Sequence, residues 1–205
     1  MSAAADVTII DSGGANLASL RYALDRLGAS SIVSADAASI AAARRVVLPG
    51  VGAAADAMAR LRERGLDQLI PRLRAPLLGI CLGMQLLFEH SAEGNTPCLG
   101  IIAGRIERLP AAPGLPVPHM GWNTLEIRDH DPLLAGIESG DRLYFVHSFA
   151  ADAHSCRGTL ASARYGGQLC AVVRRDNFRG VQFHPERSSS VGARILRNFL
   201  ALPCS

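Results

Sequence analysis

The sequence predicts an α/β protein with a central, mostly parallel sheet, helices on both faces and an antiparallel extension in its second half. In the first 89 residues, short apolar runs alternate with segments of helical periodicity, which is typical of a parallel sheet covered by helices. From about residue 100 to residue 181, short strand-like runs and turns rich in glycine and proline dominate instead. No internal repeat or long linker divides the chain, so we expect a single domain over residues 1–205.

The individual elements follow from apolar runs and their spacing. Short, branched apolar runs predict buried strands at residues 7–11, 31–34, 45–48 and 76–80. Helical periodicity predicts helices at residues 15–27, 37–43, 53–64 and 82–89, and a last helix at residues 189–200. Gly28 marks the end of the first helix. The proline-rich piece at residues 109–118 is expected to be a loop.

The composition excludes several classes of function. Apolar residues make up 49% and charged residues 19% of the 205-residue chain, which is typical of a globular protein. No apolar run approaches the roughly 18 residues that indicate a membrane span, so we expect no membrane partner. The net charge of +3 is mild and the arginines are scattered, which argues against nucleic acid as a partner. The chain has no lysine, which excludes Schiff-base chemistry on lysine and a lysine-dependent phosphate loop.

The cysteines indicate neither a metal centre nor a disulfide framework. They lie at positions 81, 98, 156, 170 and 204, an odd number with irregular spacing and no Cys-x-x-Cys pair. We therefore expect no metal ion. The first residues also lack a basic stretch followed by an apolar run, so no secretion signal is predicted. Together these features favour a reducing, cytoplasmic location.

The strongest chemical signal is a sharp strand-to-helix turn predicted at Cys81. Gly79 and Gly83 flank the cysteine at minus two and plus two, which is the spacing of a nucleophile elbow. Such a tight turn needs residues without a side chain beside it. The following helix would favour a thiolate at its N-terminus. An inert, buried cysteine is the alternative. The flanking glycines and a matching base elsewhere favour the nucleophile.

That base is His184, at the end of a predicted strand and two residues before Glu186. A cysteine nucleophile needs an imidazole within hydrogen-bond reach, and the imidazole needs an acceptor that fixes its orientation. Pro185 stiffens the connection between the two side chains. A His-x-Glu alone would indicate only a polar surface turn. Combined with Cys81, it predicts a catalytic triad of Cys81, His184 and Glu186.

A glycine-rich loop at residues 49–52 follows the third predicted strand. Its Gly-x-Gly-x-x-Ala spacing up to Ala55 is similar to a dinucleotide-binding fingerprint, but it does not follow the first strand. The acidic residue expected about 20 positions further on is also missing, since residues 72–76 (RLRAP) contain no Asp or Glu. We therefore interpret the loop as an oxyanion hole, in which Val51, Gly52 and the N–H of Leu82 stabilise a tetrahedral intermediate.

These three segments, PGVG at 49–52, GICLGMQLLFE at 79–89 and FHPE at 183–186, resemble the class I glutamine amidotransferases in this order. The resemblance spans essentially the whole chain. It implies a flavodoxin-like three-layer fold, hydrolysis of L-glutamine through a thioester on Cys81, and no cofactor. It also implies that Gln85 and Glu93 bind glutamine, with Glu93 at the α-amino group. The remaining implied substrate contacts are backbone groups at Gly50, Gly52, His147, Ser148 and Phe149, whereas the His119 and His147 side chains are expected to shape loops.

Other segments are similar to one subgroup, the glutaminase subunits of imidazole glycerol phosphate synthase. They are IID at 9–11 with GANL at 14–17, PHMGWN at 118–123 and YFVHS at 144–148. The resemblance implies a heterodimer with a (β/α)8-barrel cyclase subunit, which receives the ammonia. The cyclase converts a phosphoribulosyl formimino intermediate into imidazole glycerol phosphate and an aminoimidazole carboxamide ribotide in histidine biosynthesis. The second and third segments favour this subgroup over the glutaminase of pyridoxal phosphate synthase, which remains the alternative enzyme.

Four positions depart from the subgroup's usual pattern. Ser12 and Ala15 replace a tyrosine and a glycine, and Phe149 replaces a common tyrosine. Arg187 stands where the subgroup has a lysine at its partner interface; the charge is kept but the geometry changes. None of these positions belongs to the triad. A subunit that only scaffolds or regulates its partner is the non-catalytic alternative, and the complete triad argues against it.

Overall fold

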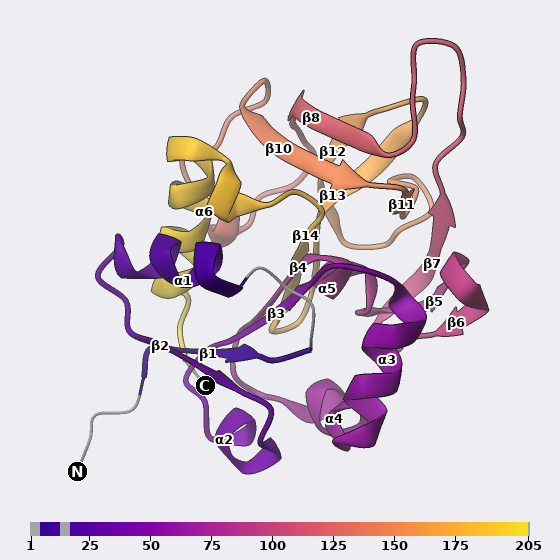
Figure 1. The fold of residues 1–205 in the computed structure, drawn as a ribbon. Helices are drawn as coiled ribbons and strands as arrows, with labels where there is room; N and C mark the ends of the chain where they lie inside the picture. Colours follow the sequence, from indigo (N-terminus) through magenta and orange to yellow (C-terminus); the bar gives the residue numbers. More distant parts are fainter. Residues whose placement is uncertain (1–4, 13–16, 205) are drawn as a thin grey trace.

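The computed structural model describes residues 5–12 and 17–204, and this part of the chain contains an eight-stranded sheet (Figure 1). Its strand order is β2-β1-β3-β4-β14-β13-β12-β9. Neighbouring strands run parallel from β2 to β14, and β13, β12 and β9 add an antiparallel extension. The predicted fold class is confirmed. Residues 13–16, with the predicted start of the first helix and most of the GANL segment, lie outside the described residues.

The parallel part of the sheet comes mainly from the first half of the chain. Its strands are β1 (Val7–Ile10), β2 (Ser31–Ser34), β3 (Val46–Gly50), β4 (Leu77–Cys81) and β14 (Phe178–Val181). The helices are α1 (Leu17–Asp25), α2 (Ala37–Ala41), α3 (Ala54–Glu63), α4 (Leu66–Leu69) with the 3₁₀ turn η1 (Ile70–Arg72), α5 (Leu82–Gln85) and α6 (Ser189–Ala201). The sequence did not predict α4, which starts after Gly65 turns the chain at a positive φ of 65°.

The second half supplies the antiparallel strands. β9 (Glu126–Ile127), β12 (Thr159–Arg164) and β13 (Gln168–Arg175) extend the central sheet. β8 (His119–Thr124) and β10 (Arg142–His147) form a two-stranded ribbon, whereas β5 (Phe88–Ser91), β6 (Thr96–Pro97), β7 (Ile102–Arg108) and β11 (Phe149–Ala150) form a small sheet. Short 3₁₀ turns lie at η2 (Glu93–Asn95), η3 (Pro132–Leu134) and η4 (Pro185–Arg187). The ribbon lies above the end of the central sheet that carries the site (Figure 1).

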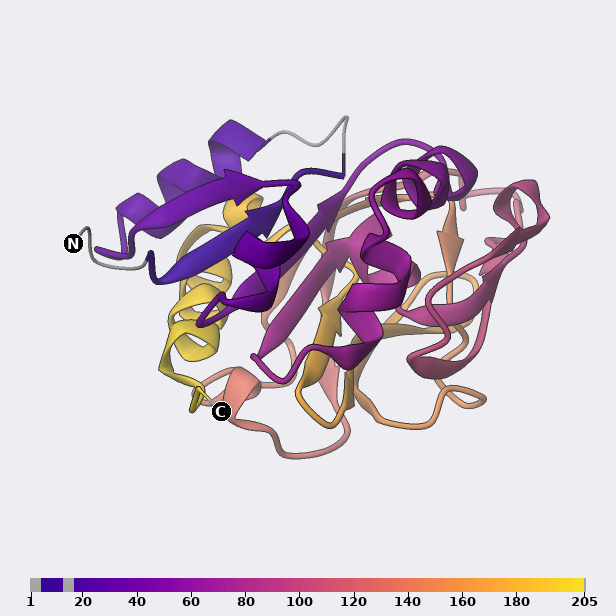
Figure 2. The same cartoon turned by 90° about the horizontal axis from the view of Figure 1, so that it is seen from below.

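Helices cover both faces of the central sheet, and each face has its own apolar core. On one face α1 and α6 lie side by side and bury Leu24 and Leu196 against the sheet (Figures 1 and 2). On the other face α2, α3 and α4 bury side chains such as Ile40 and Leu61. In the described part of the chain, no helix has the length and apolar character that crossing a membrane requires.

The helix predicted at residues 82–89 is wrong in its second half. α5 ends at Gln85, and the chain enters β5 at Phe88. β5 pairs in parallel with β7, from Phe88 opposite Ile102 onwards. Leu86, Leu87 and Phe88 are all fully buried, so the apolar run has no polar face with which to distinguish helix from extended chain. Pairing with a strand more than ten residues away decides between the two.

Candidate active site

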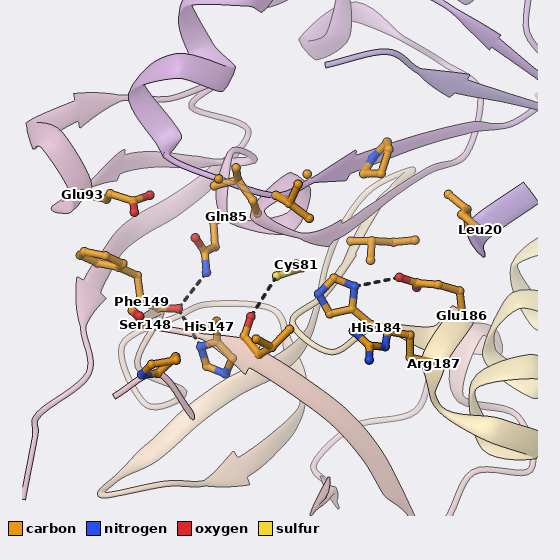
Figure 3. A pocket seen from close by; sticks show the side chains of 18 residues that line it. Leu20, Cys81, Gln85, Glu93, His147, Ser148, Phe149, His184, Glu186 and Arg187 are labelled. Atoms are coloured by element: carbon orange, nitrogen blue, oxygen red, sulfur yellow. Dashed lines mark hydrogen bonds and ion pairs between the residues drawn. The ribbon is translucent and has the colours of Figure 1, made fainter. Parts of the chain in front are cut away.

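Cys81 is the last residue of β4, and the chain turns sharply there into α5 (Figure 3). Its backbone has φ 55° and ψ −112°, outside the regions that a residue with a side chain normally occupies. Such strain persists only where the surrounding structure enforces it, and it is concentrated at functional sites. The residue is 7% exposed, and its sulfur lies 3.8 Å from the Val146 carbonyl oxygen. The turn therefore lifts the thiol out of the sheet into a cavity.

The glycines around Cys81 allow three backbones to meet. A Cβ on Gly79 would lie 2.7 Å from the carbonyl oxygen of Gly83. A Cβ on Gly50, at the end of β3, would lie 2.8 Å from the backbone nitrogen of Gly83. A Cβ on Gly83 itself would collide with the carbonyl oxygen of Leu48. β3, β4 and α5 are thus packed at distances that only glycine permits.

Replacing Gly83 by alanine is expected to destabilise the fold by about 3 kcal/mol or more, because the new methyl group has no room beside Leu48. Urea unfolding followed by circular dichroism measures this change. The control is Gly167→Ala, at an exposed position where an added Cβ meets nothing within 4 Å. A loss of stability at Gly83 no larger than at Gly167 would contradict the packing argument.

His184 lies between the Cys81 sulfur and the Glu186 carboxylate (Figure 3). Its Nδ1 is 2.8 Å from Glu186 Oε1, and both side chains are 9% exposed. Burial disfavours the charged ring, but the interactions with Cys81 and Glu186 outweigh it and raise the pKa of His184 to about 10. The imidazole is therefore protonated at neutral pH, and it can give a proton to a leaving group.

The chain reaches His184 by a different route from the one predicted. β14 ends at Val181, so the histidine lies three residues beyond the strand. Its backbone N–H donates outside the central sheet, to the Tyr144 carbonyl of β10 at 2.9 Å. The buried hydroxyl of Ser188 donates to the His184 carbonyl at 2.7 Å and accepts from the Tyr144 N–H at 2.9 Å. Ser188, which the sequence did not point to, thereby fixes the turn that carries His184 on β10.

One cavity of about 380 Å³ brings all of the predicted site residues together. Its lining contains Cys81, His184, Glu186, Gly50, Val51, Gly52, Leu82, Gln85, Glu93, His147, Ser148 and Phe149. Leu20 from α1, Pro118 before β8 and Arg187 from η4 complete part of the wall and were not predicted to do so. These residues come from both halves of the chain, and only the folded sheet brings them to the same edge.

Two glutamine side chains connect Cys81 to the far wall of the cavity. Gln85, on α5, donates from Nε2 to the Phe149 carbonyl at 2.8 Å and to Gln182 Oε1 at 3.0 Å. Gln182 is fully buried and places its own Nε2 3.8 Å from the Cys81 sulfur. The signal for Gln182 in the sequence is that it is a polar residue between Val181 and Phe183 in an apolar run.

The remaining predicted residues form the mouth of the cavity. Val51 is 36% exposed and Gly52 has a positive φ of 91°, so their backbone forms an open loop after β3. Glu93 is half-buried and accepts the Ala54 N–H through Oε2 at 2.8 Å. This bond ties the carboxylate to the first turn of α3 while it faces the cavity. Its charge suits a cationic group of a ligand.

Comparison with known proteins decides the family. The sequence model of the family described as "Glutamine amidotransferase class-I" matches residues 8–202. The chain belongs to this family. The glutamine amidotransferase match covers nearly all of the described residues, including Cys81, His184 and Glu186.

Individual relatives of this amidotransferase agree with the family match. A protein of Xylella fastidiosa named "Imidazole glycerol phosphate synthase subunit HisH" is 53% identical over 197 residues, which cover 96% of this chain and 98% of the relative. A protein of the same name from Xanthomonas euvesicatoria pv. vesicatoria is also 53% identical, with the same coverage. These values hold over the whole length, so they are not the result of one shared motif.

Solved structures of other proteins share the fold. A structure described as a glutamine amidotransferase superposes with a TM-score of 0.73 at 22% identity, covering 95% of this chain and 96% of that chain. The structure of PurLQS from Thermotoga maritima gives a TM-score of 0.72 at 19% identity, covering 95% and 96%. At such low identity these likenesses establish the fold alone.

Proposed function

We propose that this chain is the glutaminase subunit of imidazole glycerol phosphate synthase, with Cys81, His184 and Glu186 as its catalytic triad. The observation that carries the chemistry is the placement of His184 between a strained cysteine and a buried carboxylate, in one cavity. The pathway is supported by full-length relatives of that name at 53% identity. The reaction is the hydrolysis of L-glutamine to L-glutamate and ammonia.

Cys81 acts as the nucleophile on the side-chain amide of glutamine. Its sulfur adds to the amide carbon, and the oxyanion is held by the N–H of Leu82 and by the Val51–Gly52 loop. His184, protonated at neutral pH, gives its proton to the departing ammonia as the carbon–nitrogen bond breaks. The neutral imidazole then takes a proton from water, which attacks the thioester and releases glutamate. Glu186 keeps the ring oriented throughout.

The substrate's other groups contact the opposite side of the cavity. Glu93 is suited to the α-amino group because its negatively charged carboxylate is only half-buried. The Ala54 N–H holds this carboxylate in place by donating to one of its oxygens. Gln85 faces the same space from α5, where its amide is held against the Phe149 carbonyl. Backbone groups at Gly50, Gly52 and residues 147–149 surround the α-carboxylate end. These assignments follow the lining of the cavity and the family resemblance together.

The ammonia passes to a (β/α)8-barrel cyclase subunit that joins this chain in a heterodimer. Ammonia is largely protonated in neutral water, and the ammonium ion is a poor nucleophile, so direct transfer protects its reactivity. An exposed apolar surface beside the cavity supports a partner there: Met120 is 62% exposed and Trp122 45%. The Arg187 guanidinium lies 4.6 Å from the Tyr144 ring centre at the edge of this surface. Such an arginine can serve a contact usually made by lysine.

The deciding experiment measures glutamate release from glutamine by the chain alone and with each of two partners. One partner is the cyclase subunit with its substrate or product, and the other is the barrel subunit of pyridoxal phosphate synthase. We expect strong activation by the cyclase with its substrate or product, and none by the other barrel subunit. Activation only by the other barrel would keep the triad and overturn the pathway. No release with either partner would overturn the proposal as a whole.

A further inference from the structure

Two buried histidines form a continuous hydrogen-bonded chain from strand β8 to the wall of the cavity. His119 Nε2 lies 3.2 Å from Asn123 Nδ2, and His119 Nδ1 lies 3.1 Å from His147 Nε2. His147 Nδ1 then lies 2.9 Å from the carbonyl oxygen of Phe149. The mechanism proposed above uses neither imidazole, so this hydrogen-bonded chain has a purpose other than proton transfer in the reaction.

The chemistry of its two ends fixes the direction of every bond. A carbonyl oxygen can only accept, so His147 carries its hydrogen on Nδ1 and donates to Phe149. A neutral His147 then accepts at Nε2, which requires a hydrogen on Nδ1 of His119. His119 in turn accepts at Nε2 from the amide of Asn123. All three bonds point the same way, from Asn123 towards the cavity.

The environment keeps both rings neutral. Burial lowers the pKa of His119 to about 4 and the pKa of His147 to about 3. His147 also lies in the field of the protonated His184, which opposes a second positive charge. The side chains of Asn123 and Phe149 that flank the chain carry no charge. Each ring therefore remains a one-way donor and acceptor at neutral pH.

Packing holds the rings in place. His119 is stacked between Phe145 and Tyr165, with ring centres 5.0 Å and 4.0 Å away and planes inclined by 22° in both pairs. Tyr165 is fixed in its turn, because its hydroxyl donates to the Pro116 carbonyl of the loop before β8. His119 is 4% exposed and His147 6%. Rigid packing of this kind makes the chain suited to hold a geometry rather than to move protons.

The hydrogen-bonded chain of histidines ends on the Phe149 carbonyl, which decides the position of a substrate-binding side chain. The Phe149 carbonyl accepts from His147 and also from Gln85 Nε2, at 2.9 Å and 2.8 Å. We propose that His119 and His147 are positioning residues, a neutral hydrogen-bonded relay that fixes the Phe149 carbonyl, and through it Gln85, relative to strand β8. This inference rests on the proposed function, because it assigns Gln85 to the glutamine pocket. β8 also carries the exposed Met120 and Trp122, so the relay joins that surface to the pocket.

The tautomers can be observed directly in the full-length protein, without any activity. Long-range ¹⁵N–¹H correlation of the ring nitrogens should show both histidines protonated at Nδ1 alone. Neither ring should titrate between about pH 5.5 and pH 8, where a free histidine with a pKa of about 6.5 does so. A hydrogen on Nε2 of His147, or titration near pH 6.5, would overturn the relay. This result stands or falls independently of the glutaminase reaction.

Two substitutions of His147 separate its bonds from its volume. The amide nitrogen of asparagine matches imidazole Nδ1, so H147N keeps the bond to Phe149; the amide of glutamine matches Nε2, so H147Q loses it. With the partner subunit present, H147Q should raise the KM for glutamine about tenfold and change kcat less, whereas H147N, which loses only the bond to His119, should raise the KM by a smaller factor, about as much as removal of the Asn123 donor does. Equal effects of both variants would indicate packing alone and contradict the inference. A wild-type protein without glutaminase activity would instead count against the proposed function.

The link to β8 has its own test. N123A removes the first donor of the relay, and it should raise the KM for glutamine in the wild-type chain. In the H147Q background the same change should add little, since the relay is already broken. Independent, additive effects would show that Asn123 acts elsewhere, and would remove β8 from the relay.

Discussion

Replacing Cys81 by alanine is expected to lower glutamine-dependent turnover by about four orders of magnitude or more, while synthesis from added ammonium salts continues. The thioester cannot form without the sulfur, but the partner's own site does not need it. Alanine is a mild change for the fold, because it keeps the Cβ that the strained turn already accommodates. The measurement compares glutamine-supported and ammonia-supported product formation by the assembled synthase.

The matched control for this experiment is Cys98→Ala. Cys98 is half-buried and lies outside the cavity that contains Cys81. Its replacement should leave both the glutamine-supported and the ammonia-supported rates close to wild type. Glutaminase activity that survived in Cys81→Ala would refute the nucleophile assignment. Loss of the ammonia-supported rate as well would point to a damaged partner subunit, and size-exclusion chromatography checks that Cys81→Ala still assembles with it.

Replacing Glu186 by glutamine is expected to lower kcat by about 10²- to 10⁴-fold, as in other triads whose orienting carboxylate becomes an amide. The carboxylate raises the pKa of His184 to about 10, together with Cys81, so its removal moves that pKa downwards. The amide of glutamine keeps one acceptor oxygen but has an NH2 donor in place of the other, and this donor favours the wrong tautomer when it faces Nδ1. NMR titration of the His184 ring and single-turnover kinetics measure the two effects.

The control for Glu186 is Glu63→Gln, which removes the same charge from an exposed position at the end of α3. It should change neither the titration of His184 nor the rate.

The raised pKa of His184 also makes the stability of the fold depend on pH. Because the folded pKa of His184 lies above the usual 6.5, its contribution to stability is complete below pH 6.5 and is lost as the pH rises towards 10. A His184 pKa unchanged in Glu186→Gln would contradict the proposed pairing.

The grouping of Cys81, His184 and Glu186 in one cavity was largely predictable because its signals are local in sequence. Gly79 and Gly83 around Cys81 mark a turn that only glycine permits, and the structure shows backbone contacts that explain both. His184 and Glu186 are two residues apart, so their pairing needed only a sharp turn. The parallel strands β1 to β4 also follow from short apolar runs, which alternate with helices.

What the sequence could not predict depends on contacts between distant segments. The helix expected at residues 82–89 gives way to β5, because β7 offers a strand to pair with. Ser188 holds the turn that carries His184 through Tyr144, which is 44 residues away. Gln182 contacts Cys81 across 101 residues. No local periodicity encodes which polar side chain of a fold will face another.

The most direct measurement of the proposed chemistry is the site of covalent labelling by an electrophilic glutamine analogue. The assembled synthase is treated with the analogue, digested and examined by mass spectrometry, with excess glutamine as competitor. We expect a single labelled residue, Cys81, and protection by glutamine. Labelling of another cysteine, or no labelling at all, would contradict a Cys81-dependent glutaminase and favour a subunit that only binds its partner.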